Sequence, residues 1–205
     1  MRVLVATTNP DKLREIRALL PGVEVVTLEA FPCIDEPEET GATFAENARL
    51  KALYYAAHAG MLTVAEDSGL SVDALDGEPG VRSARFLRPD ASYPERFAAI
   101  AARLAERSHA VRTARFVCAL AVAEPGRLVW ETAGVVEGLI ADAPAGNHGF
   151  GYDPIFYYPP CAATFAEITE KAKLAVAHRG QAFRQLAAWL EKVAVEQASA
   201  APQNV

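Results

Sequence analysis

The chain has 205 residues, of which 51% are hydrophobic and 22% charged, a composition typical of globular proteins rather than disordered or fibrous ones. Its formal net charge of -6 argues against a nucleic acid polymer as partner, because such binding relies on basic surface. Charged residues interrupt every apolar run before it reaches the length that spans a bilayer. We therefore expect no membrane partner.

The N-terminal apolar run, residues 1–6, is shorter than the apolar segment of a secretory signal. This favours a buried first strand in a cytoplasmic protein. The three cysteines, Cys33, Cys118 and Cys161, are odd in number and widely spaced. They predict neither a disulfide framework nor a zinc site.

The first half of the chain alternates between strand and helix patterns, so the fold class is α/β. A helix that follows the first strand ends at Pro21 and Gly22, and Thr43 with Glu46 forms a capping box that opens the next helix. The segment 68–90 is rich in glycine, proline and charge, and predicts mostly loop. The predicted elements are strands at residues 3–6, 23–28 and 61–65 and helices at 10–20 and 43–58.

The second half predicts a helix, a long antiparallel strand pair and a final helix. Glu124, Pro125 and Gly126 separate the two strands and form a hairpin signal. We expect one domain over residues 1–198 and a disordered tail over 199–205. The predicted elements are helices at 94–107 and 181–196 and strands at 112–123, 127–139 and 155–158.

A polar segment, residues 7–12, lies between the first strand and the first helix. Asn9 is suited to cap the helix, with Pro10 at its first position, so free backbone N–H groups would face an anion. Lys12 and the hydroxyls of Thr7 and Thr8 add further donors. The segment predicts a phosphate site or, as the alternative, only a well-capped helix.

Two adjacent acids, Glu66 and Asp67, come directly after the predicted strand 61–65. Neighbouring carboxylates repel one another unless a positive charge lies beside them. Mg²⁺ is the natural candidate, since it takes oxygen ligands and joins carboxylates to substrate phosphates. A solvated turn is the alternative. Glu38 and Glu39 provide a second source of carboxylates.

The helix that begins near Thr43 carries Asn47 and Lys51 four residues apart, so both share one face, with Glu46 beside them. These residues are suited to bind a ligand with phosphates. The alternative is that Glu46 only closes the capping box and that Lys51 is a surface lysine.

The stretch 149–154 places two glycines, two aromatic rings and a carboxylate in six residues. Phe150 or Tyr152 offers a face to a flat molecule, while Asp153 can accept hydrogen bonds. The alternative is a tight turn before the strand at 155–158. A lysine, an imidazole and a guanidinium gather before the final helix, at Lys173, His178 and Arg179; these alternatively form a solvated basic face.

Together these stretches resemble the non-canonical purine nucleoside triphosphate pyrophosphatases, also called the inosine triphosphatase or Ham1-like family. The resemblance runs from residue 3 to about 186, and the motifs occur in the family's order. The matching stretches are residues 6–12, 38–51, 66–70, 77–85, 149–154 and 173–179.

The resemblance implies a long mixed sheet with flanking helices, shaped into two lobes around a central cleft, and a homodimer. It also implies Mg²⁺-dependent hydrolysis of ITP, dITP and XTP to the monophosphate and pyrophosphate, which cleanses the nucleotide pool. Two rival functions stay open. One is a pyrophosphatase for other modified or pyrimidine nucleotides, and the other is a non-catalytic nucleotide sensor.

The resemblance also implies a role for each matching residue. Catalysis would use Asp67, Lys12, Lys51 and Glu46, and the metal would be held by Glu38 and Asp67, with Glu66 second to them. The substrate would be bound by Thr7, Thr8, Asn9, Pro10, Asp11, Lys12, Asn47, Ser68, Phe150, Gly151, Tyr152, Asp153, Lys173, His178 and Arg179.

Discrimination between purines must come from the edge of the base. Arg179 has only donors, so we hypothesise that Arg179, or backbone N–H groups near it, recognises the 6-oxo group while Phe150 stacks on the ring. The 6-amino group of ATP, which donates hydrogen bonds, would then face these donors. Two positions depart from the family's common pattern: Ala177 stands where many members have serine, and Glu66 where many have aspartate.

Overall fold

A computed structural model describes residues 1–107 and 111–200. Its seven strands form one mixed sheet in the order β2-β1-β3-β4-β5-β6-β7. β1 is parallel to both β2 and β3, and the remaining pairs are antiparallel. The strands are β1 (Arg2–Ala6), β2 (Glu24–Thr27), β3 (Thr63–Val72), β4 (Thr113–Glu124), β5 (Arg127–Ile140), β6 (Phe156–Tyr158) and β7 (Ala163–Thr164).

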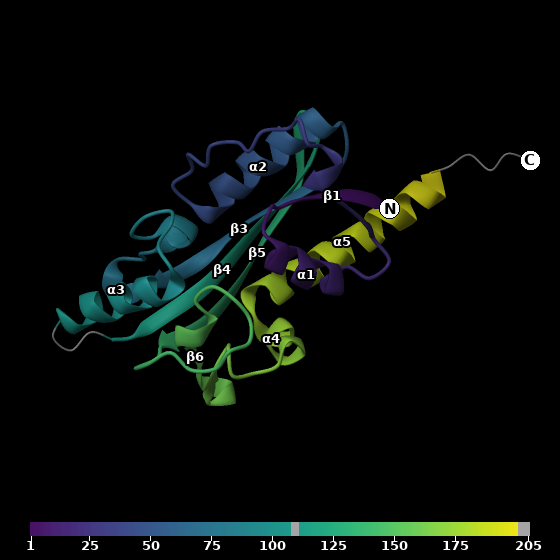
Figure 1. Ribbon diagram of the computed structural model, residues 1–205. Helices are drawn as coiled ribbons and strands as arrows, with labels where there is room; N and C mark the ends of the chain where they lie inside the picture. The colour runs from purple at the N-terminus through teal and green to yellow at the C-terminus, as the bar shows by residue number, and fades with distance from the viewer. Residues whose placement is uncertain (108–110, 201–205) are drawn as a thin grey trace, which may run out of the picture.

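Helices cover both faces of this sheet (Figure 1). α2 lies over one face, while α1 and the long α5 lie over the other. This explains the continuous apolar run of β1: Leu4 packs with α2, and Val3 and Val5 pack with α1 and α5. The helices are α1 (Pro10–Leu19), α2 (Phe44–Ala59), α3 (Tyr93–Ala105), α4 (Glu170–Val176) and α5 (His178–Ala200).

The third strand corrects the sequence prediction. β3 does not end at residue 65 but continues to Val72, because every residue from Thr63 to Val72 is in register with β4. Glu66 and Asp67 therefore lie within a strand instead of after one. Successive side chains of a strand point to opposite faces, so these two carboxylates are on opposite sides of the sheet.

The long hairpin that the sequence predicts is confirmed as β4 and β5. At the open end of this hairpin, its residues join those of β3, α3 and β6 in a core around Phe116 and Phe156, whose ring centroids lie 4.5 Å apart. Tyr152 and Ile155 belong to the same core, which anchors the loop that contains Phe150.

The C-terminal region differs from the prediction in two ways. A short helix, α4, was not expected, and α5 begins at His178 and includes Ser199. The tail therefore does not begin at 199, and residues 201–205 lie outside the described residues. α5 approaches β5 closely because Gly134 has no side chain: a Cβ there would lie 2.1 Å from the backbone oxygen of His178.

The single domain over residues 1–198 and the two-lobed shape stay predictions. Within residues 1–107 and 111–200, no helix combines the length and apolar character needed to cross a bilayer.

Candidate active site

Two neighbouring cavities meet beside the first turn of α1. The polar cavity has a volume of about 270 Å³ and is lined by charged residues from α1, α2 and β3. The aromatic cavity has a volume of about 90 Å³ and is lined by Tyr93, Phe116, Phe150 and Tyr152, among others. Both cavities are lined by Asn9, Lys12, Ser68 and Ala84.

The loop before α1 forms the cap that the sequence predicts. Asn9 Oδ1 accepts hydrogen bonds from the backbone N–H of Asp11 at 2.9 Å and of Lys12 at 3.1 Å. Thr7 Oγ1 in turn accepts from the N–H of Asn9 at 3.2 Å. These bonds fix the first turn of the helix, whose positive end faces the polar cavity.

Glu66 faces α1 and α5 and is surrounded by cations. Arg179 donates from Nε and Nη2 to its two oxygens at 2.9 and 3.1 Å, and Lys12 Nζ lies 2.9 Å from Oε1. Burial alone would raise the pKa of Glu66, but the charges of Arg179 and Lys12 outweigh burial and hold that pKa well below its usual range. Both carboxylate oxygens are thus committed to cations.

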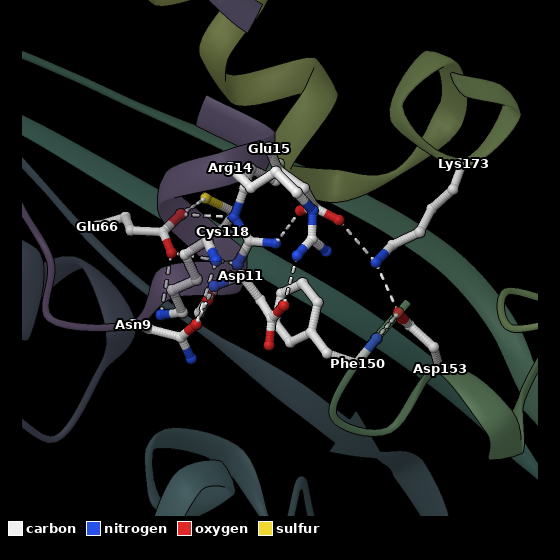
Figure 2. A network of polar contacts seen from close by, with 12 residues as sticks. Asn9, Asp11, Arg14, Glu15, Glu66, Cys118, Phe150, Asp153 and Lys173 are labelled. Carbon is white, nitrogen blue, oxygen red and sulfur yellow. Dashed lines mark hydrogen bonds and ion pairs between the residues drawn. The ribbon is translucent and has the colours of Figure 1, made fainter. Parts of the chain in front are cut away.

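The same cations belong to a larger buried network (Figure 2). Glu15 on α1 accepts from Lys173 Nζ at 2.9 Å and from Arg179 Nη1 at 2.6 Å, and Lys173 also donates to Asp153 at 2.6 Å. We call this set the six-charge network. Its three acids and three bases are Glu15, Glu66, Asp153, Lys12, Lys173 and Arg179.

Asp67 faces α2, on the other side of the sheet. Asn47 Nδ2 donates to its Oδ2 at 3.1 Å, and Lys51 Nζ lies 3.6 Å from its Oδ1. Lys51 donates to Glu39 at 2.6 Å as well, and Arg85 donates to the same acid at 3.0 Å. Burial has the largest effect and raises the pKa of Asp67, and the charge of Glu39 raises it as well. The charge of Lys51 lowers this pKa but does not cancel the rise. Asp67 is thus a carboxylate that gains a proton more readily than an exposed one.

Phe150 covers the cations of the aromatic cavity. Its ring centroid lies 4.6 Å from Lys173 Nζ and 5.5 Å from the Arg179 guanidinium carbon, which are cation–π distances. Asp153 fixes the turn by accepting the Phe150 N–H at 2.9 Å. Gly149 permits this contact, because a Cβ there would lie 2.1 Å from Asp153 Oδ2.

The aromatic cavity is small in this arrangement. Its volume of about 90 Å³ is less than the roughly 150 Å³ that holds a benzene molecule in an apolar protein cavity. The cavity is open on one side and adjoins the polar cavity, so a larger flat ligand would extend past its mouth. Gly149 and Gly151, on either side of Phe150, have φ of 69° and 67°, a backbone conformation that favours glycine.

His178 forms part of the same cavity wall. Its ring stacks on Phe116 with centroids 4.7 Å apart, and its Nδ1 has no hydrogen-bond partner among the described residues. Burial first, and then the cations of Arg179 and Lys173, lower its pKa well below the usual value. The imidazole is therefore neutral at pH 7, so one of its ring nitrogens can donate a hydrogen bond and the other can accept one.

With this geometry established, comparison with known proteins decides the family. A sequence profile of the Ham1 family matches residues 3–189, most of the chain. The chain belongs to the Ham1 family.

Ham1-family relatives agree with this along their whole length. The chain is 51% identical to a dITP/XTP pyrophosphatase of Gloeobacter violaceus over 187 residues, covering 91% of this chain and 93% of the relative. It is 46% identical to a dITP/XTP pyrophosphatase of an Exiguobacterium species over 190 residues, covering 92% and 96%. These figures show the family across nearly the entire sequence.

Solved Ham1-family structures share the fold. A HAM1 protein from Coxiella burnetii superimposes with a TM-score of 0.87 at 38% identity, covering 94% of this chain and 99% of that one. A nucleoside-triphosphatase, also named dITP/XTP pyrophosphatase, from Mycobacterium abscessus gives 0.73 at 44% identity, covering 93% and 99%. The prediction of a mixed sheet with flanking helices is thereby confirmed.

Most of the residues predicted from the Ham1 resemblance come together at the two cavities. The polar cavity is lined by Thr7, Thr8, Asn9, Lys12, Lys51, Glu66, Asp67 and Ser68. The aromatic cavity is lined by Asn9, Lys12, Ser68, Phe150, Gly151, Tyr152, Asp153, Lys173, His178 and Arg179. Asn47 is buried behind Asp67 and also accepts the Gly41 N–H at 2.8 Å.

Four predicted residues lie elsewhere. Glu46 is exposed and closes the capping box of α2, as the alternative interpretation had it. Asp11 pairs with Arg14 at 2.7 Å on the surface, and Pro10 lines a different cavity. Glu38 is exposed, and the structure places its neighbour Glu39 in the polar cavity instead. Of the two adjacent acids, Glu39 is the one that pairs with Lys51.

The hydrogen bonds of Arg179 limit how many donors it can offer to a base. A guanidinium has five N–H donors. Four of them are directed at Glu15, Glu66 and Ser68, which leaves one with no partner among the described residues. Arg179 therefore holds the walls of the cavity in place and has a single donor to offer a ligand.

Sequence reasoning missed Glu15, Glu39, Arg85 and Tyr93. Glu15 lies three residues after Lys12, so both occupy one face of α1, and this spacing was a usable signal. Glu39 was considered with Glu38, but nothing in the sequence tells which acid turns inward. Arg85 ends the stretch 77–85 that matches the family but was given no role, and Tyr93 lies outside every matching stretch.

Proposed function

We propose that this protein hydrolyses ITP, dITP and XTP to the nucleoside monophosphate and pyrophosphate. The observation that carries the proposal is the junction of the two cavities: a polar one holding Asp67 between Lys51 and Asn47 opens beside an aromatic one. A nucleoside triphosphate likewise combines a charged phosphate chain with a flat aromatic base. The names of its Ham1-family relatives, which the chain matches over nearly its whole length, support the same substrates.

The residues divide the reaction between them. Lys12 and Lys51 offset the negative charge that develops on the phosphates, as fixed donors do in other phosphoryl transfers. A water oxygen attacks the α-phosphorus, its proton passes to Asp67, and the bond from that phosphorus to the bridging oxygen breaks. Pyrophosphate leaves with the electron pair of that bond.

The polar cavity suits Mg²⁺. Within the described ranges no cluster of three or more His, Cys, Asp or Glu is arranged to hold a metal by itself. Asp67 and Glu39, however, lie together beside Lys51, and Mg²⁺ commonly uses one or two carboxylates plus substrate phosphates. Glu39 and Asp67 would hold the ion, which would neutralise phosphate charge and acidify bound water.

This proposal changes which residues are assigned as metal ligands. Glu66 was placed second as a ligand, but both of its oxygens are within hydrogen-bond reach of cations. Glu38 is exposed, away from the cavity. We propose Glu39 in place of Glu38.

The rival functions are less well supported. A nucleotide sensor needs no buried acid beside a lysine, yet Asp67 is 6% exposed and lies 3.6 Å from Lys51. A pyrophosphatase for pyrimidine nucleotides would retain this acid, so only substrate tests separate it from our proposal. The homodimer and the cytoplasmic location also stay predictions.

A nucleotide panel tests the proposed function directly. The protein is incubated with Mg²⁺ and each of ITP, dITP, XTP, GTP, ATP and dUTP, and pyrophosphate and orthophosphate are assayed separately. We expect pyrophosphate from ITP, dITP and XTP at rates well above those from GTP, ATP and dUTP. Release of orthophosphate alone would contradict attack at the α-phosphorus, and a preference for dUTP would support the pyrimidine alternative.

The adjacent acids Glu38 and Glu39 form a matched pair for the metal site. Glu39→Gln should raise the Mg²⁺ concentration needed for half-maximal activity by about tenfold or more, because a charged ligand is lost. Glu38→Gln should leave it unchanged. Magnesium titrations of ITP hydrolysis measure both, and equal effects of the two substitutions would remove Glu39 from the site.

A further inference from the structure

Tyr93, the first residue of α3, forms a wall of the aromatic cavity but not of the polar cavity. The side chain is 37% exposed, so it stands at the cavity's rim. Its neighbour across the rim is the segment that contains Phe150, since a Cβ placed on Gly151 would lie 3.6 Å from the Tyr93 hydroxyl. Tyr93 is thus near the end that would hold a base, not near the phosphate donors.

Three contacts fix the position of this ring. Tyr152 packs edge-on against it, with centroids 5.3 Å apart and an interplanar angle of 90°. The Arg96 guanidinium lies 4.9 Å from its centroid, and Phe97 packs at 6.1 Å. Arg96 is itself immobilised, because it is 3% exposed and donates to the backbone oxygens of Phe86 and Pro89 at 3.3 Å.

Tyr152 is fixed as well. It is 3% exposed, and its hydroxyl donates to the backbone oxygen of Ser83 at 2.8 Å. Tyr93 and Tyr152 therefore form one rigid corner. Phe150 belongs to another wall of the same cavity, with its ring against Lys173 and Arg179 and its N–H donating to Asp153.

The position of this corner matters for the base. Tyr93 and Tyr152 both line the aromatic cavity, and side chains held by several packing contacts do not shift without cost to make room for extra atoms. The corner therefore limits how large a base can be accommodated.

We propose that Tyr93 is a specificity-determining residue that limits the size of the substituents carried by the purine ring. This inference rests on the proposed function, because it takes the occupant of the aromatic cavity to be a purine. The limit comes from the bulk of the ring, not from a hydrogen bond by the hydroxyl. Enlarging the corner should therefore admit larger bases.

The test compares kcat/KM for ITP with that for two purines enlarged at the ring and outside the proposed substrates: GTP and 8-oxo-GTP. Tyr93→Ala should raise kcat/KM for at least one of them relative to ITP by about tenfold or more, the range for a changed pocket wall. Tyr93→Phe should leave every ratio within about twofold of the wild type. Tyr54→Ala, which removes a half-buried tyrosine outside both cavities, is the matched control.

Unchanged ratios in Tyr93→Ala would overturn the proposal, and so would a Tyr93→Phe variant that shifts them as far as Tyr93→Ala does. Tyr93→Leu repeats the test if the alanine variant does not fold. Dissociation constants for IMP, XMP and GMP are measured on the same proteins. If the wild type releases no pyrophosphate from ITP, the proposed function fails, while the ratio of these constants still decides whether Tyr93 limits base size.

Discussion

Asp67→Asn should lower kcat for ITP by a factor of about 10² to 10⁴, the range that a general base contributes. The amide cannot accept the proton that the attacking water loses. Asn47 can still donate to the amide oxygen as it does to Asp67 Oδ2 at 3.1 Å, so the fold and the nucleotide affinity should survive. Single-turnover rates with ITP and binding measured by calorimetry separate these two effects.

The matched control is Asp142→Asn, which changes an acid whose side chain is 97% exposed. It should leave kcat within about twofold of the wild type. If Asp67→Asn retains near-normal turnover, Asp67 is not the proton acceptor. If it instead abolishes binding, its main role is to hold the metal and the phosphates.

Arg179→Ala should lower the free energy of unfolding by about 3–5 kcal/mol, the cost of breaking a buried ion pair from one side. Arg179 is 2% exposed, and its removal leaves the buried Glu66 and Glu15 with one lysine each in place of two cations. Since the guanidinium organises both cavity walls, affinity should fall for ITP and ATP alike. Our sequence-based hypothesis would instead have ITP affected more than ATP.

Urea denaturation of Arg179→Ala and two comparison variants measures the change in the free energy of unfolding. Arg184→Ala on the same helix removes an exposed guanidinium that donates to the backbone oxygens of Leu174 and Ala175, and it should cost about 1 kcal/mol or less. Adding Glu66→Gln to Arg179→Ala removes one of the stranded charges, so the double variant should be more stable than the sum of the single losses predicts. Strict additivity would show that the two residues are not energetically coupled.

The features that the sequence predicted well are those set by nearby residues. The cap at Asn9 and the capping box from Thr43 to Glu46 each involve a few consecutive residues, so residue type and spacing were sufficient. The hairpin of β4 and β5 was predicted because its turn signal and both strands are contiguous. The Ham1 resemblance supplied the mixed sheet with flanking helices, whereas the order of its strands was not predicted.

The parts that were missed depend on partners far along the chain. β3 extends to Val72 because β4, some fifty residues later, pairs with it throughout. That pairing places Glu66 and Asp67 on opposite faces, an outcome that no local pattern contains. Glu15 meets Lys173 across a separation of 158 residues, so its role becomes visible only in three dimensions.

The balance of the six-charge network has a kinetic consequence. Each of its cations lies within 2.9 Å of a carboxylate oxygen, and opposite charges this close largely cancel at a distance beyond the Debye length of about 8 Å at physiological salt. Combined with the chain's formal charge of -6, this leaves little long-range electrostatic steering of an anionic ligand. Encounter with a nucleotide then depends on diffusion, and the affinity develops only after contact, when the local donors are within reach.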